Sequence, residues 1–195
     1  MDLSKTGVLI SKMRHEKGLT QKQVAEALGI NPKTVSKWER GNGFPDIGSV
    51  PKLSEILGID ISKLLQGELP DAKREVGNMK RIKFYVCENC GNILTSTGNC
   101  EISCCGRKLD ALKPLTPDSE HTPIIEAIET EHYVTFSHPM TKAHYISFSA
   151  FVRFDRVLTI KLYPEQNCEF RVPQMRKGSL YYYCTEHGLF EYKLT

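Results

Sequence analysis

Residues 19–41 read LTQKQVAEALGINPKTVSKWERG, and this stretch decides the fold of the N-terminal part of the chain. Thr20 followed by Gln23 is a capping box that predicts the start of a short helix. Asn31-Pro32 supplies an N-cap and a first-turn proline for a second helix. Only Gly29-Ile30-Asn31 separates the two, and two helices joined by so short a turn predict the helix-turn-helix geometry.

The residues on either side of this stretch continue the helical pattern. Apolar residues recur at helical spacing from Val8 to Leu65, and Gly18, Gly58 and Gly67 follow three of the periodic groups as stop signals. We therefore expect residues 1–69 to form a five-helix bundle that contains the helix-turn-helix.

The charge distribution fits a polyanionic partner for this part of the chain. Residues 1–83 carry 15 Lys/Arg against 10 Asp/Glu, whereas residues 84–195 carry 11 against 13. In the helix at 32–40, Val35 and Trp38 face the core. Lys33, Thr34 and Lys37 then remain for DNA phosphates and base edges.

Leu19–Ile30, Val35–Gly41 and Pro45 together resemble the phage-repressor (xenobiotic-response-element type) helix-turn-helix family over roughly the first 65 residues. The resemblance implies a homodimer that reads a palindromic site in double-stranded DNA. It implies that Gln21 caps the second helix. It also implies a set of DNA-binding residues: Gln21, Lys33, Thr34, Lys37 and Arg40. Pro32 stands where many relatives carry a polar base reader. A bundle used for protein contacts is the alternative.

All seven cysteines lie in the second half of the chain: Cys87, Cys90, Cys100, Cys104, Cys105, Cys168 and Cys184. The N-terminus has no secretory pattern and no apolar run reaches the ~20 residues of a membrane span, so we expect a cytoplasmic protein without membrane contact. Clustered thiols in a cytoplasmic chain indicate metal ligation or redox chemistry rather than disulfides.

A mixed-charge segment with Pro70 and Gly77 predicts a linker over residues 70–83, followed by a small metal module over residues 84–115. Cys87-Glu-Asn-Cys90 and Cys104-Cys105 offer four thiolates from two loops, which suits a tetrahedral site. Iron and zinc use the same ligands here.

Residues 116–195 predict an all-β domain. The pattern is one of short aromatic and β-branched segments between turns, typical of an immunoglobulin-like β-sandwich. The expected strands lie at residues 145–154, 157–163, 169–172, 180–184 and 189–194. The fold class is therefore multidomain α plus β.

Histidines gather in the same region. His138 and His144 are six residues apart, Cys184-Thr-Glu-His187 is a C-x-x-H pair, and His121 precedes Thr122-Pro123. Imidazoles with one thiolate suit ferrous iron or zinc.

Phe84–Gly91 and Ser103–Gly106 resemble desulforedoxin, and the histidine motifs resemble the superoxide reductase (neelaredoxin-like) domain, which together make a desulfoferrodoxin-like arrangement. The resemblance implies iron at both sites. It implies a tetracysteine site of Cys87, Cys90, Cys104 and Cys105, and a second site of His121, His138, His144 and His187 with Cys184 axial. In that family ferrous iron reduces superoxide to hydrogen peroxide by one electron, with the axial thiolate donating electron density.

The chain departs from the family next to His121. Ser119 and Glu120 stand where the family has a glutamate and a lysine, so an anion meets a negative charge. Glu120 and Lys142 are the candidate catalytic residues, Lys142 as a replacement cation. We expect a DNA-binding regulator that senses superoxide or another small redox effector. A superoxide reductase with an added DNA-binding domain and a repressor with a zinc staple are the alternatives.

Overall fold

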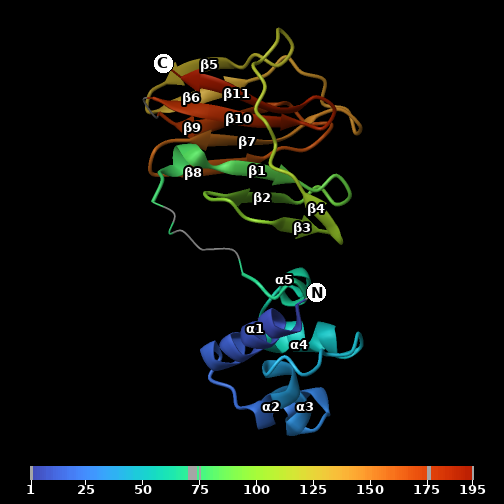
Figure 1. Cartoon of the computed structure of the whole chain (residues 1–195). Coiled ribbons are helices and arrows are strands. Elements are labelled where there is room, and N and C mark those ends of the chain that lie inside the picture. Colours follow the sequence, from blue (N-terminus) through green and yellow to red (C-terminus); the bar gives the residue numbers. More distant parts are fainter. Residues whose placement is uncertain (1, 70–73, 75, 175–176, 195) are drawn as a thin grey trace. The chain divides into compact units, whose positions relative to one another are not determined.

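The computed structural model describes residues 2–69, 74, 76–174 and 177–194, and the chain divides into two compact units (Figure 1). Unit 1 is Met1–Lys73 and unit 2 is Arg74–Thr195. Part of the predicted linker, residues 70–73 and 75, lies outside the described residues.

Unit 1 is helical, which confirms the prediction of five helices. They are α1 (Leu3–Glu16), α2 (Gln21–Leu28), α3 (Pro32–Glu39), α4 (Ser49–Leu57) and α5 (Ile61–Gln66). The Thr20 hydroxyl accepts from the Gln23 N–H, and the Gln23 side chain accepts from the Thr20 N–H, as the capping box requires. Asn31 caps α3, and Gly29 ends α2 in the left-handed region. No helix in the described part of the chain is long and apolar enough to cross a membrane.

The core of unit 1 is one apolar cluster contributed by every helix. Val24, Val35, Leu53 and Leu57 are fully buried, and Trp38, the one tryptophan of the chain, is 4% exposed. Burying such side chains stabilises the folded state by about 1.5–3 kcal/mol each relative to exposure. This packing holds α3 against α1 and α2.

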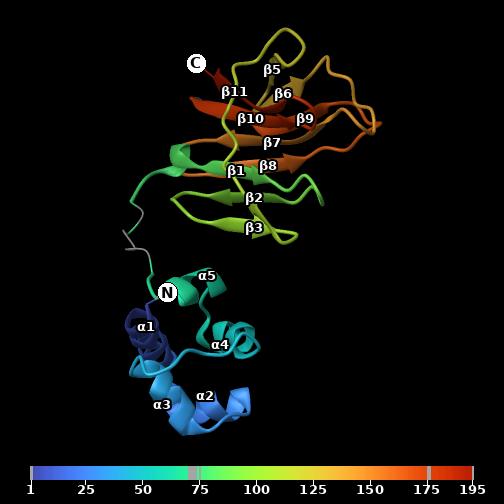
Figure 2. The same cartoon turned by 45° about the vertical axis from the view of Figure 1, so that its right-hand side comes forward.

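Unit 2 contains a β-sandwich of seven antiparallel strands, confirming the β-rich C-terminal region (Figure 2). One sheet has the order β11 (Gly188–Leu194), β10 (Gly178–Cys184), β7 (Ile146–Val152), β8 (Val157–Lys161). The other has the order β5 (Ile124–Ile128), β6 (Glu131–Thr135), β9 (Glu169–Pro173). A core with residues from both sheets, among them Val134, Phe170, Ile146 and Tyr182, lies between them.

The two central strands of the four-stranded sheet, β7 and β10, are buried on both faces. Along β10, Leu180, Tyr182 and Cys184 face the sandwich core, whereas Tyr181 and Tyr183 face outward into a second cluster. That outer cluster is completed by Phe84, whose ring centroid lies 5.2 Å from that of Tyr181.

Phe84 belongs to the cysteine-bearing module, which is built from two hairpins. The first pairs β1 (Lys83–Val86) with β2 (Ile93–Ser96), and the second pairs β3 (Ile102–Cys104) with β4 (Arg107–Leu109). Because Phe84 packs on the sheet, the module shares a core with the sandwich. The 3-10 helix η1 (Met79–Arg81) and Lys83 also belong to unit 2, so the last residues of the predicted linker are ordered secondary structure.

Candidate metal centres and nucleic-acid interface

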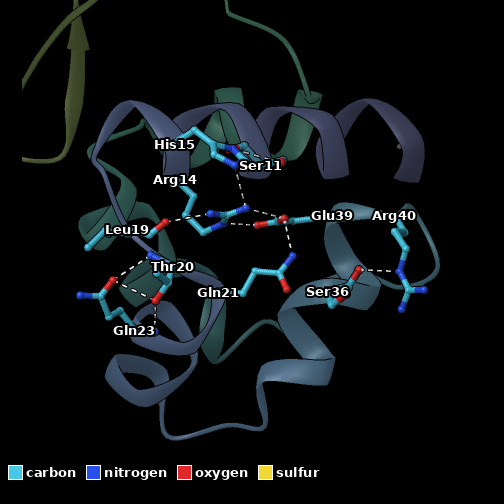
Figure 3. A network of polar contacts seen from close by, with 10 residues as sticks. All are labelled: Ser11, Arg14, His15, Leu19, Thr20, Gln21, Gln23, Ser36, Glu39 and Arg40. Atoms are coloured by element: carbon cyan, nitrogen blue, oxygen red, sulfur yellow. Dashed lines mark hydrogen bonds and ion pairs between the residues drawn. The ribbon is translucent and has the colours of Figure 1, made fainter.

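The predicted DNA-binding residues lie on or beside α3. Lys33, Lys37 and Arg40 are exposed, and Thr34 is half-buried. The Arg40 Nε donates to the carbonyl oxygen of Ser36 at 3.1 Å (Figure 3). Three cations on one helix and its C-cap are suited to phosphate oxygens and base edges.

Gln21 has a different structural role from the one implied by the resemblance. Thr20 caps α2, while the Gln21 side-chain amide donates to Glu39 Oε2 at 2.8 Å (Figure 3). Glu39 also receives two bonds from the Arg14 guanidinium, 2.5 Å from Nε and 3.0 Å from Nη2. Gln21 is therefore tied to the end of α3.

The Arg14–Glu39 ion pair is buried, with side-chain exposures of 9% and 7%. Burial alone would raise the pKa of Glu39, but hydrogen bonds from Arg14 and Gln21 lower it below its ordinary value. The remaining Nη1 of Arg14 donates to the carbonyl oxygen of Leu19. Sequence reasoning missed Arg14 and Glu39, because a charged pair spaced 25 residues apart gives no local signal. The pair links α1 to the end of α3.

Two hairpin ends bring four sulfurs together. The β1–β2 register closes at Val86 and Ile93, which leaves Cys87 and Cys90 in the connecting loop, and β3 ends at Cys104. The donor sulfurs of Cys87, Cys90, Cys104 and Cys105 all lie within 4.8 Å of one another. Gly91 and Gly106 follow the pairs at φ of 67° and 73°, a backbone conformation that glycine adopts without strain.

The sulfur cluster has the chemistry of a cation site. The Cys90 backbone N–H lowers the pKa of the Cys87 thiol to about 7, although burial opposes it. For Cys90, an N–H from Asn92 favours the thiolate, but the crowding thiols prevail and raise its pKa to about 12. Four thiolates so close together require a metal cation to neutralise them. Asn92, which sequence reasoning missed, also directs its side-chain amide to Cys104 Sγ at 3.9 Å.

The histidine–cysteine group forms at one end of the sandwich, because the strand registers align there. Ile124 pairs with Thr135, so His121 before β5 and His138 after β6 meet at the same end of one sheet. In the other sheet Ile146 pairs with Cys184 and Cys184 with Gly188. This second register brings together the remaining donors, His144, Cys184 and His187.

The five donor atoms of this group lie within 4.8 Å of one another. The four imidazoles form a closed ring of neighbours in the order His121, His138, His144, His187, with centroid separations of 4.6–4.9 Å. Cys184 Sγ lies 3.5 Å from His187 Nδ1. Four imidazoles around one point with a thiolate beside them form a five-donor cage.

The buried imidazole nitrogens of this group are suited to bind a metal ion. His121 Nε2, His144 Nε2 and both ring nitrogens of His138 are buried, without a hydrogen-bond partner among the described residues. Burial, foremost, lowers the pKa of His138, which favours the neutral ring and its nitrogen lone pair. Burial raises the pKa of the Cys184 thiol, so a thiolate there needs a cation. Buried unpaired donors of this kind suit iron or zinc.

Two carboxylates that sequence reasoning missed contact the ring from outside. Asp118 Oδ1 lies 2.6 Å from His121 Nδ1, and Glu186 Oε2 lies 3.3 Å from His144 Nδ1. The hydrogen bond from His121 holds the pKa of Asp118 below its ordinary value. Of the predicted catalytic residues, Glu120 is exposed next to His121, and exposed Lys142 lies 3.7 Å from Glu165 Oε1. The structure thus shows Lys142 paired with a carboxylate.

Comparison with known proteins matches each unit separately. The desulfoferrodoxin of Desulfarculus baarsii is 32% identical over 119 residues, covering 56% of this chain and 94% of that protein. The chain belongs to the desulfoferrodoxin family. The desulfoferrodoxin of Syntrophotalea carbinolica is 30% identical and 95% covered. The superoxide reductase of Treponema pallidum shares the fold, with a TM-score of 0.51, 20% identity, and coverage of 57% of this chain and 97% of that one.

The N-terminal unit has other relatives. Residues 10–64 match the family model described as helix-turn-helix. The HTH-type transcriptional activator BcrR of Enterococcus faecalis is 35% identical over 81 residues, which cover 40% of this chain and 39% of that protein. The chain therefore joins a helix-turn-helix DNA-binding domain to a desulfoferrodoxin module.

Proposed function

We propose that the chain is a cytoplasmic transcriptional regulator that binds double-stranded DNA as a homodimer and responds to superoxide or another small redox effector through iron. The observation that carries the proposal is the five-donor cage in the same chain as a helix-turn-helix. Three of its histidines, His121, His138 and His144, have buried ring nitrogens without a hydrogen-bond partner among the described residues. Iron, when bound, supplies one-electron redox chemistry. Cys87, Cys90, Cys104 and Cys105 would hold one iron; the four histidines of the ring and Cys184 would hold the other.

The charges around the cage favour a sensor over an efficient superoxide reductase. Asp118 and Glu186 touch the imidazoles, Glu120 adjoins His121, and Lys142 is paired with Glu165. A superoxide anion approaching this end meets carboxylates, and like charges at short range oppose binding by about 1 kcal/mol or more.

The first test is the metal content of protein purified without oxygen, followed by gel shifts on DNA upstream of its own operon. We expect two irons per chain and an affinity for DNA that changes at least about fivefold between reduced and oxidised protein. Cys184→Ser should abolish the redox response and leave DNA binding intact. Cys100→Ser, which alters a thiol outside both donor groups, is the matched control.

The complete donor set supports a second candidate function, superoxide reductase with an appended DNA-binding domain. Pulse radiolysis of the ferrous protein separates the two. A near diffusion-limited rate with superoxide and no redox effect on DNA affinity would favour the enzyme. Zinc at the tetracysteine site without iron elsewhere would indicate a DNA-binding protein with a structural zinc site and no redox response.

A further inference from the structure

Asp118 fixes the orientation of His121 through three hydrogen bonds to a single oxygen. Asp118 Oδ1 accepts from the Glu120 N–H at 3.1 Å, from the His121 N–H at 2.9 Å and from the His121 ring Nδ1 at 2.6 Å. The Thr122 hydroxyl closes the turn by donating to the Asp118 carbonyl oxygen. His121 is 1% exposed, and its opposite nitrogen, Nε2, is the buried atom without a partner. The carboxylate thus sets which nitrogen faces the cage.

Glu186 lies beside His144 at an ion-pair distance, longer than the Asp118–His121 hydrogen bond. Its Oε2 lies 3.3 Å from His144 Nδ1, and His144 Nε2 is again buried and unpartnered. Glu186 lies in the turn between Cys184 and His187, so the segment that carries two donors also orients a third.

The two histidines held by carboxylates lie at opposite corners of the ring. Each imidazole contacts two other imidazoles, and His121 and His144 are both neighbours of His138 and of His187. The carboxylates therefore act on opposing ligands.

A carboxylate that accepts the Nδ1–H of a ligating imidazole fixes its tautomer and makes its Nε2 a stronger donor. Stronger donation and added negative charge favour the more positive oxidation state of a bound metal. We propose that Asp118 and Glu186 are positioning residues of the histidine–cysteine centre that jointly lower the ferric/ferrous reduction potential of its iron. This inference rests on the proposed function, because it assumes iron at that centre.

The test is a spectroelectrochemical titration of the iron-loaded full chain and of Asp118→Asn, Glu186→Gln and the double variant. The electrode delivers one electron to the ferric centre. We expect the potential to rise in each single variant. In the double variant, the equilibrium should shift toward ferrous iron by about tenfold or more, which is about 59 mV for one electron. The thiolate-to-iron absorption band should shift as well.

Two controls separate this effect from general loss of charge. Glu126→Gln removes an exposed carboxylate from β5, outside the donor group, and should leave the potential unchanged. The tetracysteine iron is an internal reference whose potential should stay fixed in every variant. If Asp118→Asn no longer retains iron at the centre, Glu186→Gln decides the test.

The outcomes are distinct. Unchanged potentials in iron-loaded single and double variants overturn this inference and leave the proposed function standing. Equal shifts in Glu126→Gln also overturn it, since orientation by hydrogen bonding would then be irrelevant. A wild-type chain that takes up iron only at the tetracysteine site overturns the proposed function, and this inference with it.

Discussion

Arg14→Met should strongly destabilise the helix-turn-helix unit, because it leaves the Glu39 carboxylate buried without its cation, with only the neutral donors Gln21 and Ser11 beside it. The lost contacts are two hydrogen bonds to Glu39, of 2.5 Å and 3.0 Å, in a pair that is less than a tenth exposed, and the bond from Arg14 Nη1 to the Leu19 carbonyl oxygen. Breaking a buried ion pair by removing one partner costs about 3–5 kcal/mol. For a domain of this size each kcal/mol corresponds to roughly 4–8 °C in Tm, so we expect a loss of about 12–40 °C.

Trp38 provides the assay, because the one tryptophan of the chain is buried in the core of unit 1. Its fluorescence follows the unfolding of that unit in the full chain. The double variant Arg14→Met/Glu39→Met should be more stable than Arg14→Met alone, since no unpaired charge is then buried. A single variant that loses less than about 1 kcal/mol, or a double variant less stable than the single, would refute the reasoning.

The same pair predicts a pH dependence. The folded-state pKa of Glu39 is lowered, so its contribution to stability is fully present above the unfolded pKa and is lost as pH falls through the folded one. In Arg14→Met the carboxylate is protonated more readily. The stability difference between wild type and variant, measured by Trp38 fluorescence, should therefore shrink in acid; a constant difference from neutral to acid pH contradicts this.

Three further outcomes are expected. Phe84→Ala should lower the free energy of unfolding of unit 2, measured by circular dichroism, by about 3–5 kcal/mol, because a fully buried ring leaves the cluster around Tyr181. A loss below about 1 kcal/mol would contradict the shared core. Cys104→Ser should halve the iron content by metal analysis while leaving the histidine–cysteine centre loaded, and loss of both metals would show the sites to be interdependent. Lys33→Ala and Lys37→Ala should each weaken DNA binding and, where the contact is to phosphate, reduce the salt slope by about one in gel-shift titrations; an unchanged affinity and slope would remove α3 from the interface.

Local signals in the sequence were sufficient for the helical unit. A capping box, an N1 proline and a left-handed glycine act within one turn of the chain, so both ends of α2 and the start of α3 follow directly from residues 20–32. Among the strands, β7, β8, β9, β10 and β11 were predicted within three residues. β2 to β6 were missed. β5, for example, lies at the edge of its sheet with all five of its residues exposed or half-buried, so it lacks a strong apolar alternation.

The sequence did not predict that the cysteine module packs on the sandwich, and the reason is different. Alternation along β10 shows only that both faces are apolar, with Tyr181 and Tyr183 on one side and Leu180 and Tyr182 on the other. Which segment covers the outer face depends on three-dimensional placement. Phe84 fills that place, so a module expected to be separate shares its core with the neighbouring sheet.

In the histidine–cysteine group, too, the sequence predicted the residues of local motifs but not the long-range contacts. The Cys184–His187 spacing is a local motif, and the resemblance supplied the other histidines. The carboxylates have no such motif. Asp118 precedes its histidine by three residues and is brought to it by a turn, whereas Glu186 reaches His144 only because Cys184 pairs with Ile146 across the sheet. A one-residue slip of that register would turn Cys184 out of the core. The β7–β10 pairing that brings the donors together therefore also places Glu186 beside His144. A change in this pairing would displace the ligands and the carboxylate together.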